Sequence, residues 1–143
     1  MNEKQSFKPV VMLSIVLTLL MLTLSACAND RVIKASLDKE FSLAIGQTAK
    51  ISGENLTIKL TDVTNDSRCP QGVTCVWAGE VTCALDITLN GKIESYQLVV
   101  SGAGGVGGKT YQNYYLNGNV EPYPKQGVEI TKTDYRMKMT VSK

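Results

Sequence analysis

The sequence contains no histidine, a single tryptophan and no marked excess of charge of either sign. Without histidine the chain lacks the commonest general base near neutral pH and the commonest transition-metal ligand, which excludes histidine-based hydrolytic triads. The 15 basic and 13 acidic residues give a net charge of +2, and this balance is not typical of nucleic-acid binding. Hydrophobic residues make up 43% of the 143 positions, which is enough for the core of one globular domain and excludes a disordered or collagen-like chain.

The N-terminal segment has the pattern of an export signal. Lys4 and Lys8 precede an apolar run over residues 10–24, in which three hydroxyl residues are the only polar members. A transmembrane helix needs about 20 apolar residues, so this run is too short to span a bilayer comfortably. A secretory signal peptide is therefore predicted, and a transmembrane anchor is the less favoured alternative.

The end of this run reads Leu24-Ser25-Ala26-Cys27, which resembles the lipobox of bacterial lipoproteins at every position. The resemblance implies cleavage before Cys27, a diacylglyceryl group on its sulfur and acylation of the new amino group. Two or more acyl chains hold a protein stably on a membrane. We therefore expect a lipid-anchored protein on the extracytoplasmic side of the cell membrane or outer membrane, with residues 1–26 as signal peptide, 27–38 as lipidated cysteine and tether, and 39–143 as the folded domain.

Apolar residues in the mature chain alternate with polar ones at period two, and no helical stripe interrupts this pattern. The clearest alternating runs cover residues 41–45, 56–60 and 135–141. Each run predicts a strand with one buried and one solvated face. Short strands separated by frequent turn signals indicate an all-β fold, which we interpret as an antiparallel β-sandwich of about seven to nine strands with an immunoglobulin-like or Greek-key arrangement. A small barrel is the alternative.

Asn90-Gly91 predicts a β-hairpin, because both residues tolerate the positive φ of a type I′ turn. If Leu89 pairs with Lys92, the numbers of paired residues sum to 181. This register places Cys83 opposite Leu98 and puts the apolar residues of both strands on one face. A slip of one residue would turn all of them outward.

Two shorter strands are expected over residues 111–116 and 128–131. Pro122 and Pro124 lie between them, and proline favours a turn or a sheet edge because it cannot donate a ladder hydrogen bond.

Three cysteines remain once Cys27 is assigned to the lipid. Cys83 lies on the inward face of the hairpin and is expected to behave as a small hydrophobic residue. An extended strand from Cys75 to Cys83 would span about 26 Å, far beyond the roughly 7 Å limit between bridged Cα atoms. A Cys69–Cys75 disulfide is therefore predicted. No CxxC pair or histidine is present, so neither a metal site, a redox centre nor another cofactor is expected.

Residues 66–80 read DSRCPQGVTCVWAGE. This segment resembles the DSRCPxGVxCxWAGE signature of a family of small secreted proteins and lipoproteins without an established activity. Residues 122–125 and 134–135 are similar to a second part of that family's pattern, whereas residues 102–119 depart from it. The resemblance implies a secreted β-sandwich with this disulfide.

Several residues of this segment suit a structural or a binding role. Arg68 is expected to pair with Asp66, Glu80 or Asp62. Trp77 either covers the disulfide as packing or forms a binding site together with Arg68 and Glu80. Both interpretations stay open at the level of sequence.

Residues 103–110 match a relaxed phosphate-binding-loop pattern, AGGVGGKT. Such a loop cradles phosphate at the N-terminus of a helix, but the residues that follow have poor helix propensity. Nucleotide binding is therefore not expected, and a flexible glycine-rich surface loop is the preferred interpretation.

Three classes of function remain. The first is a non-catalytic module that binds an envelope protein, peptide or glycan, or has an envelope-structural role, with Tyr114 and Tyr115 as possible contact residues besides Tyr111 and Tyr123. The second is an extracytoplasmic peptidase inhibitor, because the glycine-rich stretch Gly102–Gly108 resembles the inhibitory loops of chagasin-like proteins. The third is an enzyme that uses the carboxylates of Asp66 and Glu80. We expect the first, and no enzymatic activity.

Overall fold

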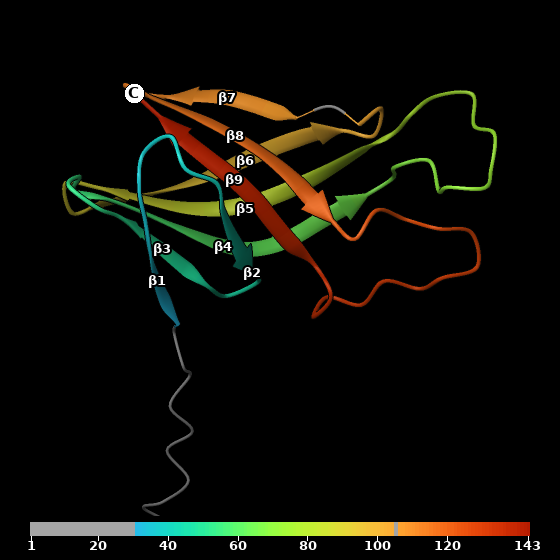
Figure 1. The fold of residues 1–143 in the computed structure, drawn as a ribbon, viewed down its shortest axis with the longest axis horizontal. Coiled ribbons are helices and arrows are strands. Elements are labelled where there is room, and N and C mark those ends of the chain that lie inside the picture. The colour runs from blue at the N-terminus through green and yellow to red at the C-terminus, as the bar shows by residue number, and fades with distance from the viewer. Residues whose placement is uncertain (1–30, 105) are drawn as a thin grey trace, which may run out of the picture.

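The computed structural model describes residues 31–104 and 106–143. These residues form nine strands and no helix, and so hold no helix that could cross a membrane (Figure 1). The predicted signal peptide and Cys27 lie outside the described residues. The strands are β1 (Val32–Ala35), β2 (Phe41–Ala44), β3 (Thr48–Ile51), β4 (Leu56–Asp66), β5 (Glu80–Leu89), β6 (Lys92–Ser101), β7 (Gly107–Tyr111), β8 (Tyr114–Glu121) and β9 (Arg136–Ser142).

The nine strands form two sheets. The five-stranded sheet has the order β1-β3-β4-β5-β6, and the four-stranded sheet has the order β2-β9-β8-β7. All neighbouring strands are antiparallel except β1 and β3. The predicted all-β sandwich is confirmed. Its sheets are largely built from consecutive strands, whereas an immunoglobulin domain distributes its strands between the two sheets in an interleaved order.

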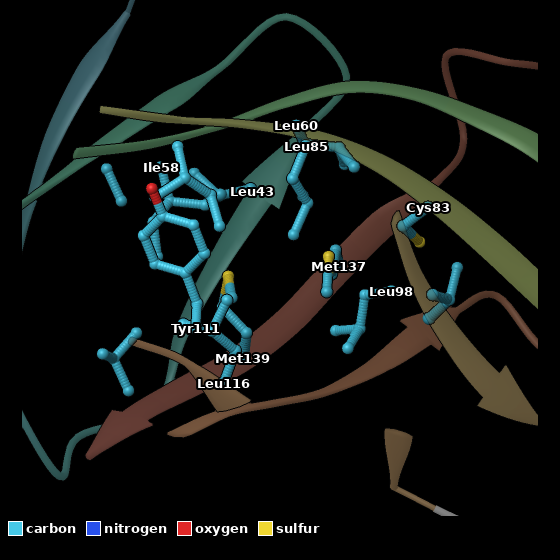
Figure 2. Packing of buried hydrophobic residues seen from close by; sticks show 14 of the residues in the cluster. Leu43, Ile58, Leu60, Cys83, Leu85, Leu98, Tyr111, Leu116, Met137 and Met139 are labelled. Carbon is cyan, nitrogen blue, oxygen red and sulfur yellow. The ribbon is translucent and has the colours of Figure 1, made fainter. Parts of the chain in front are cut away.

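The core lies between the two sheets and follows the alternation in the sequence (Figure 2). On β4, Leu56, Ile58 and Leu60 are fully buried, and on β9 Met137 and Met139 face them from the other sheet. Between these positions lie Thr and Lys residues that are less buried. Period-two patterning therefore decides which face of each strand enters the core.

The β5–β6 hairpin has the predicted register. The ten Cα pairs between Glu80↔Ser101 and Leu89↔Lys92 all sum to 181. Asn90 and Gly91 both have positive φ, 52° and 82°, as a type I′ turn requires. Cys83 pairs with Leu98 and is fully buried, as expected.

The strand expected over residues 111–116 is wrong, because the chain reverses at Gln112-Asn113 between β7 and β8. Tyr111 and Tyr114 pair across this turn and are both buried. In a continuous strand, residues three apart point to opposite faces, so burial of both rings requires the reversal. Strand β7 also includes Gly107 and Gly108, so the glycine-rich segment is only partly a loop.

The strand expected over residues 128–131 is also wrong, since this segment belongs to the loop between β8 and β9. Its backbone bonds locally: the Thr131 amide donates to the Asp134 carboxylate at 2.8 Å, and the Asp134 amide donates to the Thr131 carbonyl at 3.0 Å. A side-chain-capped turn of this kind competes with strand pairing.

The structure also differs from the expected tether. Residues Val32–Ala35, placed within the tether by the sequence pattern, form β1 and pair with β3. Ala35 is buried. Four residues are too few to show an alternation clearly, so the domain extends further toward the N-terminus than the pattern indicates.

Candidate functional site

Three loops form one end of the sandwich, which we call the loop end. They are the β4–β5 loop (67–79), the described part of the β6–β7 loop (102–104 and 106) and the β8–β9 loop (122–135). Figure 1 shows the β4–β5 and β8–β9 loops projecting from the same end of the molecule, away from β1. Most of the residues predicted for a site come from the first of these loops.

The buried side chain of Arg68 links the β4–β5 loop to the end of β8 and to the start of the β8–β9 loop. Its guanidinium donates to the Asp66 carboxylate from Nε at 2.8 Å and from Nη2 at 2.7 Å. It also donates to the carbonyls of Val120 at 2.5 Å and Pro122 at 2.9 Å, and its Cζ lies 5.0 Å from the centre of the Tyr123 ring. Asp66 is thus the partner among the three carboxylates considered for Arg68.

Arg68 is only 3% exposed, and four of its five N–H donors are already used. A direct contact between Arg68 and a ligand, which the sequence suggested, is therefore wrong. The side chain holds the loop end together instead, because one cation satisfies acceptors that lie more than 50 positions apart in the sequence.

The charges of this cluster are strongly coupled. Burial alone would raise the pKa of Asp66, but the hydrogen bonds and charge of Arg68 outweigh it and hold the pKa below its usual value. The Tyr135 hydroxyl donates to Asp66 at 3.1 Å. Burial, and next the Asp66 charge, raise the pKa of Tyr135 to about 12. Asp66 is therefore ionised and Tyr135 neutral near neutral pH.

The β4–β5 loop is closed by a disulfide and by its own backbone. Cys69 and Cys75 are bonded, with their Cα atoms 6.0 Å apart, which confirms the predicted pairing. The Cys69 amide donates to the Ala78 carbonyl at 2.8 Å, and the Ser67 amide donates to the Glu80 carbonyl at 2.8 Å. The loop therefore has a fixed base.

Two further contacts fix this loop against its neighbours. The Gly102 amide donates to the Gly79 carbonyl at 2.8 Å, and the Gln71 amide donates to the Pro124 carbonyl at 2.9 Å. A Cβ on Gly102 would lie 2.0 Å from the Ala78 carbonyl oxygen, and one on Gly79 would lie 1.8 Å from the Ser67 carbonyl oxygen. Both positions need glycine because another backbone passes there.

Trp77 lies on the outside of this fixed loop. Its side chain is 80% exposed, so it does not cover the disulfide as packing. Val76 is fully exposed and Val73 partly so, and Val128 of the β8–β9 loop and Val106 of the β6–β7 loop are also exposed. Exposed apolar side chains are therefore present on all three loops of the loop end, and exposed apolar surface is a common feature of interaction sites.

A groove lies beside the disulfide loop, with a volume of about 690 Å³. Gln71 lines it from the β4–β5 loop, and Tyr123, Lys125 and Asp134 line it from the β8–β9 loop. Amide, aromatic and charged side chains are mixed here, so the groove favours no single sign of ligand charge.

The remaining predicted site residues are dispersed. Glu80 is exposed at the start of β5, at the base of the disulfide loop. Tyr114 is buried at the opposite end of β8, where its hydroxyl donates to Glu54 at 2.6 Å. Tyr115 faces outward from the four-stranded sheet. The loop end therefore contains Arg68 and Trp77, with Glu80 next to it at the start of β5, but neither Tyr114 nor Tyr115.

A catalytic carboxylate pair is not formed by Asp66 and Glu80, since Asp66 is engaged by Arg68 and Tyr135. In residues 31–104 and 106–143, no cluster of three or more acidic or cysteine side chains could hold a metal ion.

Sequence reasoning missed the exposure of Val73 and Val76. Val73 lies inside the small loop closed by the Cys69–Cys75 disulfide and Val76 directly follows it, and such a short loop has no second layer of structure to bury them.

Comparison of the chain with protein-family models, with curated proteins and with solved structures found no match.

Proposed function

We propose that this protein is a lipid-anchored extracytoplasmic lipoprotein that docks, without catalysis, onto another protein of the cell envelope through its loop end. The observation that carries the proposal is the side chain of Trp77, 80% exposed on a loop closed by a disulfide and by backbone hydrogen bonds. An indole that had evolved for packing would be covered instead.

An exposed tryptophan on a rigid loop suits binding for two reasons. Tryptophan is enriched among the residues that contribute most to protein–protein affinity. A loop that is already ordered loses little conformational entropy on association, which improves the affinity gained from each contact. Arg68 contributes indirectly by fixing the β4–β5 loop to the carbonyls of Val120 and Pro122.

A protein partner is favoured over a glycan by the chemistry around Trp77. Its sequence neighbour Val76 and the nearby Val73 are apolar and exposed, and such a protrusion fits an apolar pocket on a protein. A sugar would require hydrogen-bonding side chains around the aromatic ring. Glycan binding remains an outcome of the experiment below.

The anchor is supported by the signal pattern and the lipobox-like Leu24–Cys27 segment. An extracytoplasmic location is also consistent with a disulfide, since these bonds persist in oxidising compartments.

The docking proposal is tested by photo-crosslinking in the producing cell. A photoreactive amino acid replaces Val76 in the full chain, and a matched control places it at Ile93, an exposed apolar residue on β6. We expect one discrete protein adduct from position 76 and none from position 93. Excess purified full chain should compete for the adduct at least tenfold better than its Trp77→Ala variant, in line with a hot-spot residue.

Equal adducts from both positions, or competition that does not depend on Trp77, would contradict the docking site. An adduct that peptidoglycan hydrolases remove would indicate a glycan instead of a protein partner.

A second candidate is inhibition of an extracytoplasmic peptidase. It is favoured by the hydrogen bond between Gly102 and Gly79, which sets the glycine-rich loop beside the Trp77 loop. The purified full chain should then inhibit a cysteine peptidase, and Trp77→Ala should weaken the inhibition at least tenfold. Absence of inhibition across a panel of such enzymes excludes this candidate while leaving docking to other proteins intact.

A further inference from the structure

Two lysines lie side by side on the outer face of the β1–β3 edge. Lys34 and Lys50 are Cα partners in the parallel pair, and both are exposed. The inward residues next to them, Ala35 and Ile51, are buried, so the two ammonium groups share the outer face. They also line one shallow depression.

Among the described residues, the charges of this lysine pair have no ion-pair partner. Glu54 lines the same depression, but its carboxylate accepts hydrogen bonds from Tyr114 and Lys143. Like charges directly opposite each other destabilise a pair of strands. A bound anion would therefore reduce the repulsion between Lys34 and Lys50.

The surface continues with Arg31 and Val32, both exposed. We call Arg31, Val32, Lys34 and Lys50 the basic edge. It combines three cations with one exposed apolar side chain on and next to β1, a terminal strand of the sheet. On the outer face of the central strands, Asp86 is paired in register with Lys59 on β4 and accepts a hydrogen bond from Ser95.

The basic edge lies close to the proposed anchor. Five residue steps separate Cys27 from Val32, and an extended chain of that length spans at most about 18 Å. If Cys27 carries the lipid, as the proposed function holds, the edge of the sheet stays within this distance of the membrane surface.

We propose that the basic edge rests on the anionic headgroups of the membrane that holds the lipid anchor, and so orients the sandwich on it. Each basic residue near an anionic surface strengthens the contact by roughly fivefold. In Figure 1 the chain enters β1 far from the projecting β4–β5 loop. With the β1 edge on the membrane, Trp77 therefore remains free for a partner.

The test uses the purified lipidated full chain in vesicles of phosphatidylcholine alone or mixed with phosphatidylglycerol. Brief acetylation of amines, read by mass spectrometry, measures the accessibility of each lysine. On the anionic vesicles, labelling of Lys34 and Lys50 should fall by about fivefold, while Lys125 at the loop end should change little. High salt should abolish the difference because it screens exposed charges.

Two variants sharpen the test. Lys34→Gln should reduce the protection of Lys50, whereas the matched surface variant Lys125→Gln should leave it unchanged. Equal labelling of Lys34 and Lys50 on both kinds of vesicle overturns the proposal. Protection that follows protein density instead of anionic lipid indicates contact with a second copy of the chain and also overturns it.

Failure of the anchor would be visible separately, before any labelling, as protein that floats with neither kind of vesicle. That result would overturn the anchoring in the proposed function together with this inference. Protein that floats with both kinds of vesicle but shows equal labelling of Lys34 and Lys50 on them would overturn this inference alone.

Discussion

Arg68 illustrates how far a single residue could be understood from the sequence. Its pairing with a nearby carboxylate was predictable, because Asp66 lies two positions away. Its burial was not, because the carbonyls of Val120 and Pro122 that cover it come from the end of β8 and the loop after it, more than 50 positions away. The exposure of Trp77 was also unpredictable from the sequence, because an aromatic residue near a disulfide suits a core and a surface equally well.

Asp66→Asn should strongly destabilise the protein. The change leaves the buried Arg68 charge without a counter-charge, which typically costs about 3–5 kcal/mol. Chemical denaturation measures the free energy of unfolding. The matched control is Asp62→Asn, which removes an exposed ion pair with Lys132 and should cost at most about 1 kcal/mol. Equal costs for the two variants would refute the structural role of the Asp66–Arg68 pair.

The Asp66 carboxylate should also make stability depend on pH. Burial works against its ionisation, but Arg68 holds its pKa below the ordinary value of 3.8. Such a group contributes stability that is complete above the unfolded pKa and is lost as the pH falls through the folded one. The stability gap between wild type and Asp66→Asn should therefore narrow below about pH 4. If the difference in unfolding free energy between the two proteins stayed constant down to the lowest pH at which they fold, this result would contradict an ionised Asp66–Arg68 pair.

Local turn chemistry determined how well the elements could be predicted. Asn90-Gly91 specifies a two-residue turn, and the alternation on both sides confirms one register, so the β5–β6 hairpin was predictable pair by pair. The turn at Gln112-Asn113 has no such signature, although Gln112 adopts a φ of 50°. There, burial of two tyrosines overrides the local preference, and only the three-dimensional packing reveals it.

The disulfide loop should respond to reduction as a separate element. Closing the seven residues from Cys69 to Cys75 stabilises the fold by roughly 2 to 2.5 kcal/mol in the chain-entropy model. Reductant should lower the unfolding free energy of the wild type by this amount and leave a Cys69→Ser/Cys75→Ser variant unaffected. A similar response of both proteins would show that the bond contributes nothing.

A thiol assay on the mature, unreduced chain complements this measurement. The folded protein should show no reactive thiol, because Cys83 is buried and burial raises its pKa to about 12. Unfolding should expose one thiol. Two or more would mean that Cys69 and Cys75 are unpaired or that Cys27 carries no lipid.

At the scale of the molecule, the core, the basic edge and the loop end lie in different parts of the sandwich. Its core is made by alternating strands, its β1–β3 edge carries two lysines without an ion pair among the described residues, and its loop end carries the exposed Trp77. The fold class was predictable because it depends on periodicity. The order of the strands was not, since β1 and β2 are only four residues each and their sheets are decided by packing.

Lipid attachment makes a prediction for the whole chain. The mature wild type should begin at Cys27, carry the added mass of its acyl groups and enter the detergent phase on phase separation. Cys27→Ser should retain residues 1–26 and carry no acyl mass. A mature wild-type chain that begins elsewhere, or that has no added lipid, would contradict the anchor.

The central claim is that Trp77 is exposed on a loop whose backbone is held by a disulfide and by hydrogen bonds. Because the chain has a single tryptophan, its fluorescence reports on this residue alone. In the oxidised protein we expect ready quenching by acrylamide together with an anisotropy decay that follows the tumbling of the whole molecule, and after reduction of the disulfide a faster local decay. Emission that resists quenching, or fast segmental motion of the loop already in the oxidised protein, would contradict the claim.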